Sequence, residues 1–382
     1  MSRRGPLSAA VAFVRRESAT FASLATAALL YLGATWFESL DSAPVQAIPL
    51  FAWIFAIMLW SSFAVVRHAD GLAEILGEPY GTLILTLAAI TIEVAVIAAM
   101  MLHGAENPTL ARDTMLAVLM IVLNGMVGLS LLIGGLRHGE QDFNLQGARA
   151  FVSVLVTLAT LALVLPDFTQ STLDGSLTPG QSAFFVIVTV LLYVTFLSIQ
   201  TIRHRGFFVQ PEPSLEPDAS LATDGESFHG RPTTIARHVL LLAVTLAAIV
   251  LLSKKLAIVT EYGMDKLHAP DALGGILVAV LVLAPEGLAA LHAASQNRLQ
   301  RSVNICLGSA LATIGLTVPA VLFIGLLVDL HIVLGLDYSH LVLLALTLLL
   351  SVVTFSGGRT NVLQGAVHLV VFMVYLLLVF SP

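Results

Sequence analysis

The sequence predicts an all-α membrane protein with about eleven transmembrane helices. Of its 382 residues, 57% are hydrophobic and only 11% are charged, whereas a soluble chain carries about 25% charged residues. The apolar runs reach about 20 residues, which is the length that a helix needs to cross a bilayer. They are too long and too continuous for barrel strands, which alternate over about ten residues. Composition therefore excludes a soluble enzyme.

Charge and cysteine content restrict the partners further. The net charge is −6 and the isoelectric point is about 6.0, so nothing favours nucleic acid as a partner. The single cysteine, Cys306, excludes a disulfide framework and a cysteine-based metal cluster. We expect a lipid bilayer as the surroundings and no cofactor, and the sequence leaves the oligomeric state open.

Apolar stretches long enough to span a membrane occur throughout the chain. The first is too long for a signal-peptide core, and no small-residue cleavage site follows it, so we expect it to be retained. The predicted spans are 19–37, 47–66, 81–102, 114–136, 148–168, 179–202, 235–253, 271–294, 302–328, 339–356 and 360–380.

The basic residues predict the orientation of these spans, because cytoplasmic loops are enriched in lysine and arginine. If the N-terminus is cytoplasmic, then all of the 18 lysines and arginines fall on the cytoplasmic side except Arg112, Lys254, Lys255 and Lys266. An odd number of spans then places the C-terminus on the external, periplasmic side.

One long polar stretch, 203–234, divides the chain after the sixth span. It is rich in proline and acidic residues, so it cannot bury enough apolar surface to fold alone. We interpret it as a solvated cytoplasmic linker, with an acidic cation-sensing segment as the alternative. The predicted organisation is an N-terminal segment with an extra helix (1–46), a first five-helix repeat (47–202), the linker (203–234) and a second five-helix repeat (235–382).

The repeat is indicated by two matching segments. The stretch from Gly81 to Glu93 and the stretch from Gly274 to Glu286 each begin with glycine, run apolar and end in a glutamate at the same spacing. Each glutamate lies on the second span of its five-span half. A five-span unit reverses its orientation when it is repeated, and inverted repeats are typical of secondary transporters.

Glu93 and Glu286 are the only ones of the 24 acidic residues that fall in the middle of a long apolar span. A charge there costs roughly 2.5–3.5 kcal/mol on insertion scales. The structural alternative is a protonated glutamate that holds two helices together. The matched positions of the two residues favour a functional site, so we predict that they form a paired cation- and proton-binding site near the middle of the membrane.

Further oxygen-bearing side chains accompany the two glutamates. Thr86 lies on the same helical face as Glu93, Asn124 lies in the middle of the fourth span, and Ser309 and Thr313 lie in the ninth span. Close packing of helices through small residues is the alternative for the hydroxyl side chains. We also expect Pro285 and Pro319 to perturb their helices, and His292 and His368 to be packing residues.

Carboxylate, hydroxyl and amide oxygens suit hard cations such as Ca²⁺, Na⁺ and K⁺. Two carboxylates leave the empty site with two negative charges, which are costly to carry through a dehydrated intermediate. One Ca²⁺ neutralises them, as do two protons, or one Na⁺ or K⁺ with one proton. Because the empty site cannot easily move, the two loads must alternate, and this is the physical logic of an antiporter.

At these residues the sequence resembles the calcium:cation antiporter superfamily, and most closely the bacterial calcium/sodium/potassium–proton antiporters. The resemblance is carried by Gly77-Glu78-Pro79-Tyr80-Gly81 through Glu93, by Arg112-Asp113-Thr114 to Asn124-Gly125, and by Leu283-Ala284-Pro285-Glu286 through Gly308-Ser309. It implies two inverted five-helix repeats with an extra N-terminal helix, cation export across the bacterial inner membrane in exchange for protons, and Glu93 and Glu286 as the repeat glutamates.

Two departures from the superfamily concern the ion and its coupling. The Gly-Asn pair expected just before the first glutamate is absent, and the second repeat retains only Gly308-Ser309. Proton coupling is therefore favoured over sodium coupling, and the preferred cation stays open. The main rival is a cation channel with a paired-glutamate selectivity site. An intramembrane enzyme lacks its motifs here, and a structural scaffold predicts silent Glu-to-Gln changes.

Overall fold

The computed structural model of the protein describes residues 12–33, 46–77, 80–103, 108–172, 174–210, 232–267, 269–270 and 272–381. Several predicted features lie outside these residues. They are the cytoplasmic N-terminus up to residue 11, the end of the first predicted span from residue 34, Glu78 and Pro79 of the motif before Glu93, and the acidic linker at 211–231.

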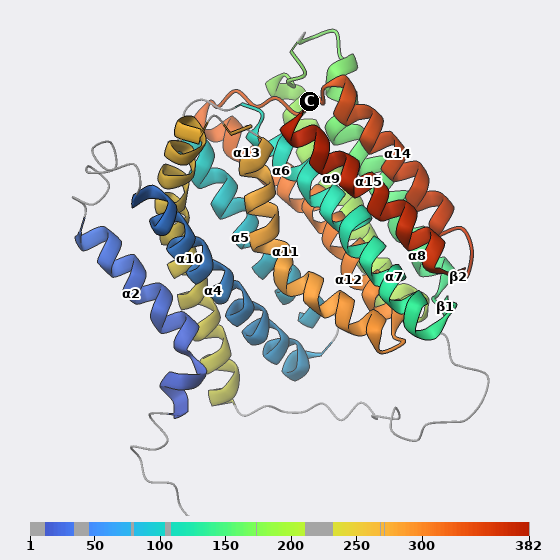
Figure 1. The fold of residues 1–382 in the computed structure, drawn as a ribbon, viewed down its shortest axis with the longest axis horizontal. Helices are drawn as coiled ribbons and strands as arrows, with labels where there is room; N and C mark the ends of the chain where they lie inside the picture. Colours follow the sequence, from blue (N-terminus) through green and yellow to red (C-terminus); the bar gives the residue numbers. More distant parts are fainter. Residues whose placement is uncertain are drawn as a thin grey trace, which may run out of the picture. The chain divides into compact units, whose positions relative to one another are not determined.

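The described chain is almost entirely helical (Figure 1). The elements are α2 (Ser18–Leu32), α4 (Ala47–Leu76), α5 (Tyr80–His103), α6 (Leu110–Leu119), η2 (Met120–Met126), α7 (Val127–His138), β1 (Gln141–Asp142), α8 (Leu145–Ala159), η3 (Thr160–Val164), η4 (Leu165–Phe168), α9 (Pro179–Ser198), η5 (Ile199–Arg203), η6 (Arg205–Phe208), α10 (Pro232–Leu267), α11 (Ala272–Ser295), α12 (Leu299–Ala312), η7 (Thr313–Thr317), α13 (Val318–Val328), α14 (Tyr338–Thr354), β2 (Arg359–Thr360) and α15 (Val362–Phe380).

Within the described residues, nine helices are long and apolar enough to cross a membrane. Two shorter apolar helices, Ser18–Leu32 and Tyr338–Thr354, occupy the positions of the first and tenth predicted spans. The protein is therefore a multi-pass helical membrane protein, while the count of eleven spans stays a prediction. The strands β1 and β2 form one short antiparallel pair, which the sequence did not predict.

The chain divides into two compact units. Unit 1 comprises Met1–Ala105 and Ser227–His268, and unit 2 comprises Glu106–Glu226 and Ala269–Pro382. Each unit draws helices from both sides of the predicted linker. The inverted-repeat arrangement of 47–202 and 235–382 stays a prediction about the sequence.

In its described residues, unit 1 contains a bundle formed by α2, α4, α5 and α10. The helices α4, α5 and α10 pack against one another, and α2 packs against α4 and α10 (Figure 1). Apolar side chains such as Ile54 and Met58 of α4 and Ile249 of α10 are completely buried. Polar contacts add to this packing, because the hydroxyls of Thr20 and Thr245 are 2.8 Å apart between α2 and α10.

Unit 2 is built around the continuous helical segment α6–η2–α7. Within the unit, α11, α12, α14 and α15 all pack against parts of it. The approach of α7 to α15 is close at Gly365, where an added Cβ would lie 2.6 Å from the backbone nitrogen of Leu132. Glycine at this position lets the two helix backbones come together, as small residues do in other membrane helix pairs.

Two helices of unit 2 change to π-helical geometry at related positions. The segment η2 starts at Met120 and η7 starts at Thr313, the same number of residues after Glu93 and Glu286 respectively. Such π-helical turns inside α-helices are rare and occur often at functional sites. Pro319 lies in the first turn of α13 directly after η7, so the predicted perturbation of this span is a π-helical interruption. By contrast, α11 continues through Pro285.

Candidate functional site

The half of the predicted site in unit 2 is organised by Glu286 on α11. Its side chain is half-buried, and the hydroxyl of Ser309 on α12 donates a short hydrogen bond to its Oε2 atom. Two residues that the sequence predicted as site members are therefore in direct contact. The contact joins the two helices that follow one another in the second half of the chain.

A close helix approach in unit 2 positions α11. A Cβ added to Gly275 would lie 2.7 Å from the backbone nitrogen of Thr114 and 2.8 Å from the backbone carbon of Asp113. One turn of α11 thus rests directly on the backbone of α6. Further along α11, Gly287 faces the sulfur of Met126 at the end of η2, so the segment that carries Glu286 packs against the π-helical turn.

The electrostatic surroundings of Glu286 are simple. Among the described residues, no arginine, lysine or histidine forms an ion pair with it, and Ser309 supplies its hydrogen bond. A carboxylate with a hydroxyl neighbour and no fixed positive charge can exchange a proton for a metal cation, because no side chain neutralises it permanently.

Asn124, on η2, lies in a separate polar network. Its Nδ2 atom donates to the hydroxyl of Thr347 at 2.8 Å, and its Oδ1 atom is 3.1 Å from Nδ1 of His368. The amide is fully buried. Because an amide oxygen only accepts, His368 donates from Nδ1, and its Nε2 atom then accepts from the hydroxyl of Thr354 at 2.9 Å. The structure thus joins Asn124 to α14 and α15, and His368 is a buried hydrogen-bonded residue as expected.

Thr313 opens the π-helical segment η7, one turn after Ser309. Its side chain is buried. Here the backbone N–H of Val318 donates to the carbonyl oxygen of Thr313, five residues earlier, where an α-helix would use the carbonyl four residues earlier.

The remaining predicted site residues, Glu93 and Thr86, belong to unit 1. Both lie on α5, where Glu93 is 1% exposed and Thr86 is partly exposed two turns earlier. The two side chains share one face of the helix, as the spacing predicted. The pairing of Glu93 with Glu286 joins residues of different units and stays a prediction.

Sequence analysis missed a cluster of charged residues in unit 1. Glu17, at the start of α2, is fully buried and contacts Arg67 and His68 of α4. The only signal in the sequence is that Glu17 directly follows Arg15-Arg16 at the edge of an apolar run. Edge positions are normally solvated, so composition did not single out this glutamate.

A metal ion that stays bound to the protein needs a permanent set of ligands, which a transported cation does not. Within the described ranges, no group of three histidine, cysteine, aspartate or glutamate side chains is arranged to hold a metal ion. Any cation at the predicted site would therefore take ligands from hydroxyl, amide and carbonyl oxygens as well as from carboxylates.

The comparison with protein families decides the class of this chain. The family described as "Sodium/calcium exchanger protein" matches residues 46–202 and 237–381. The chain belongs to this family. The resemblance to calcium:cation antiporters is thereby confirmed, and the two matched stretches flank the predicted linker.

Two curated relatives align over most of the chain. The sodium-potassium/proton antiporter ChaA of Escherichia coli (strain K12) is 40% identical over 348 residues, which cover 91% of this chain and 92% of that protein. The putative ionic transporter y4hA of Sinorhizobium fredii (strain NBRC 101917 / NGR234) is 42% identical over 340 residues, which cover 89% of this chain and 90% of its own.

Solved structures support the fold of an exchanger. The structure of native YfkE aligns with a TM-score of 0.68 at 19% identity, covering 92% of this chain and 99% of that one. The H⁺/Ca²⁺ exchanger CAX aligns with a TM-score of 0.61 at 16% identity, covering 94% of this chain and 88% of that one. At these identities the likeness shows the shared fold.

Proposed function

We propose that this protein is a secondary active cation/proton antiporter of the bacterial inner membrane. It exports Ca²⁺, Na⁺ or K⁺ in exchange for protons by alternating access, with its N-terminus in the cytoplasm. Membership of the exchanger family supports this proposal, as do the names of its relatives, one a sodium-potassium/proton antiporter and another a Ca²⁺/H⁺ antiporter at 24% identity.

The observation that carries the proposal is the setting of Glu286. It lies within an apolar helix with a hydroxyl donor and, among the described residues, no basic ion-pair partner. Together with Glu93 it would give an empty site two negative charges, which are costly to hold in a dehydrated state. Loading with Ca²⁺, with two protons, or with one monovalent cation and one proton removes this cost. The binding site therefore changes its access from one side of the membrane to the other only when it is loaded, in both directions of the cycle.

The oxygen ligands of the cation come from several elements in this proposal. Ser309 and Thr313 serve beside Glu286, and Thr86 serves beside Glu93. Asn124 joins them through the second lone pair of its Oδ1 atom, the first of which accepts the hydrogen bond from His368. These side chains are hard oxygen donors, which favour alkali and alkaline-earth cations over zinc or copper.

The two carboxyl groups must meet for this mechanism to operate. Ca²⁺ binds oxygen at 2.3–2.6 Å, so Glu93 and Glu286 should lie within about 15 Å of each other in the assembled protein. An experimental structure, or a distance measured between spin labels near the two positions, checks this expectation. A larger separation in every state of the transport cycle would refute the shared site.

Transport in inside-out membrane vesicles tests the function. Respiration acidifies the lumen, and Ca²⁺, Na⁺ and K⁺ are then added separately to the medium, which faces the cytoplasmic side of the protein. An antiporter releases protons from the lumen when its cation is added. Cation uptake without proton release would instead support a channel, and no response to any of the three cations would contradict the proposal.

A further inference from the structure

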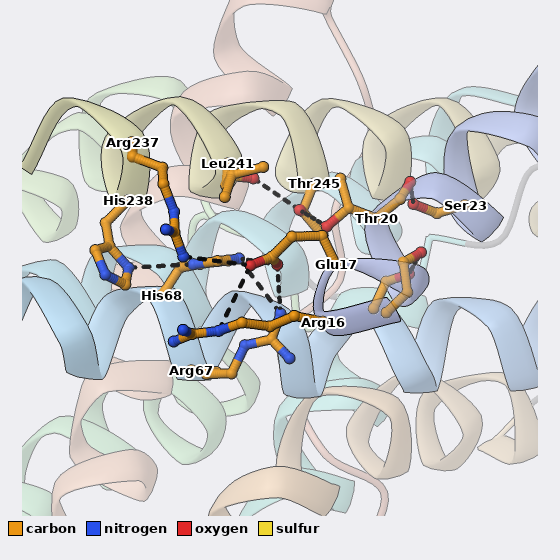
Figure 2. A network of polar contacts seen from close by, with 12 residues as sticks. Arg16, Glu17, Thr20, Ser23, Arg67, His68, Arg237, His238, Leu241 and Thr245 are labelled. Carbon is orange, nitrogen blue, oxygen red and sulfur yellow. Dashed lines mark hydrogen bonds and ion pairs between the residues drawn. The ribbon is translucent and has the colours of Figure 1, made fainter. Parts of the chain in front are cut away.

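A network of charged side chains lies at one end of unit 1, where α2 meets α4 and α10 (Figure 2). At its centre, Glu17 is 0% exposed. Its Oε2 atom accepts a hydrogen bond from Arg67 at 2.7 Å and lies 3.1 Å from Nε2 of His68. All these residues belong to unit 1, whereas Glu286 belongs to unit 2.

The network continues from α4 to α10 through two histidines. The Nδ1 atoms of His68 and His238 are 3.2 Å apart. A hydrogen bond at this distance needs one N–H and one lone pair. Since Nε2 of His68 donates to Glu17, a neutral His68 accepts at Nδ1, and His238 donates to it. Glu17, His68 and His238 thus form a chain of hydrogen bonds across three helices.

The backbone of α4 provides the space for this contact. A Cβ added to Gly71 would lie 2.7 Å from Cε1 and 3.0 Å from Nδ1 of the His238 ring. A glycine in a helix interior costs roughly 1 kcal/mol relative to alanine. Here it lets the imidazole of His238 lie against α4 next to His68.

Other charges face the histidine pair from each helix. Glu17, Arg67 and His238 act on His68, and Arg237, Arg16, Glu17 and Arg67 act on His238. The second oxygen of Glu17 lies 3.8 Å from Arg16 and 3.7 Å from Arg237. On α5, the other helix packed against α4 and α10, Glu93 is titratable, but it is not among the charges that act on either histidine. One carboxylate therefore faces three arginines as well as the histidines.

The histidine pair can accept one proton and keep its contact, but it cannot accept two. With one proton, an imidazolium donates to a neutral imidazole. With two, an N–H faces an N–H at 3.2 Å, and both rings add positive charge beside three arginines. Like charges at this distance repel, so the second proton breaks the contact between α4 and α10. The packing of α2 against these two helices becomes weaker as a result.

We propose that Glu17, His68 and His238 form a proton-binding site, distinct from the transport glutamates, that controls the packing of α2 and α10 on α4. The ligand is the proton of the surrounding aqueous phase. By the asymmetry of basic residues, this phase is the cytoplasm. For an antiporter that brings protons into the cytoplasm, a site that loosens the bundle in acid slows import when the cytoplasm is already acidic. Only this last consequence rests on the proposed function.

Disulfide cross-linking of purified protein tests the site without any transport measurement. The hydroxyls of Thr20 and Thr245 are 2.8 Å apart, on α2 and α10 beside the network (Figure 2). The double variant Thr20→Cys/Thr245→Cys is made in a Cys306→Ala background, so that only the introduced pair can react. The same pair with His238→Gln is the matched control, because His238 is half-exposed and glutamine cannot gain a proton. Thiol ionisation changes with pH equally in both.

Cross-linking yield is compared from about pH 8 to about pH 4.5. This range extends well below the ordinary histidine pKa of about 6.5, because the second proton has to bind beside a charged ring and three arginines. At each pH, the yield of the cysteine pair with the native His238 is divided by the yield of the same pair with His238→Gln. We expect this ratio to fall at least about threefold from the highest to the lowest pH, which corresponds to about 0.6 kcal/mol. Adding Gly71→Ala, which pushes the His238 ring away, should lower the yield at every pH. A ratio that does not change with pH would overturn the proposal.

Exchange in inside-out vesicles supplies a second readout, with the pH of the medium varied on the cytoplasmic side. The native protein should lose activity in acid more steeply than His238→Gln does. Identical pH profiles would contradict the regulatory consequence. If neither protein exchanges ions at any pH, the proposed function fails, while the cross-linking result still decides the proton site.

Discussion

Glu17 in unit 1 and Glu286 in unit 2 are both carboxylates within helical membrane protein, but their neighbours differ. Glu17 is fully buried and receives a hydrogen bond from Arg67, with two further arginines within 4 Å of its other oxygen. Glu286 is half-buried and receives a hydrogen bond from Ser309. The first carboxylate is neutralised by fixed charges of the protein, and the second is not.

This difference indicates what each carboxylate can do. A carboxylate held by guanidinium groups holds helices together, because removing either partner leaves an uncompensated charge. A carboxylate that has only a hydroxyl neighbour must take its neutralising charge from outside, as a proton or a cation. The identity of the neighbours, rather than burial alone, distinguishes Glu17 from Glu286 and is what fits Glu286 to the role proposed for it.

The largest expected effect on stability concerns Glu17. Glu17→Ala leaves Arg67 and His68 without their acceptor and should lower the free energy of unfolding by about 1–3 kcal/mol, a range that allows for the partial exposure of Arg67. Thermal unfolding in detergent measures this loss. Glu74→Ala, an exposed change on α4, is the matched control and should stay within about 0.5 kcal/mol. Equal stability of the two variants would contradict a structural role for Glu17.

Ser309 is the corresponding test in unit 2. Ser309→Ala removes the hydroxyl that donates to Glu286 and should weaken the apparent affinity for the transported cation about fivefold, which corresponds to about 1 kcal/mol. Ser309→Thr keeps a hydroxyl and should retain most of the affinity. The cation concentration at half-maximal proton release measures both. An unchanged value for Ser309→Ala would exclude this hydroxyl from the site.

His368 sharpens the comparison with a network that carries no net charge. His368→Gln can replace one of its two hydrogen bonds, to Asn124 or to Thr354, so it should cost about 1 kcal/mol of stability. A network that keeps His368 neutral lets only the unfolded chain bind a proton near pH 6, which lowers the stability of the native protein there but not that of the variant. The loss should therefore be smaller at about pH 6 than at about pH 8, by roughly 0.8 kcal/mol for the ordinary histidine pKa of about 6.5 in the unfolded chain. Chemical unfolding at both values checks this. A loss that grows toward acidic pH would show that His368 is charged in the native protein.

The sequence predicted the helices well, because a bilayer demands long apolar runs that composition alone reveals. The predicted spans from residue 47 onward start within about four residues of α4, α5, α6, α8, α9, α10, α11, α12, α14 and α15. Charged residues are scarce in these spans, which singled out Glu286, and among the described residues no basic side chain forms an ion pair with it. Contacts between distant residues were not predictable. To predict the polar network of Asn124, one must know that α14 and α15 pack on η2. To predict the burial of Glu17, one must know that the first turn of α2 packs against α4. The π-helical turns η2 and η7 have no sequence signature of their own.

The central claim is that Glu93 and Glu286 carry the exchanged charge, and cation-evoked proton release by glutamine variants tests it most directly. Glu93→Gln and Glu286→Gln keep the volume and hydrogen-bonding capacity of the side chain but cannot carry a charge or a proton. In inside-out vesicles with normal amounts of folded protein, each variant should release no protons on addition of Ca²⁺, Na⁺ or K⁺, while Glu74→Gln should behave like the native protein. Near-normal proton release by both glutamine variants would show that these glutamates are not the transport site.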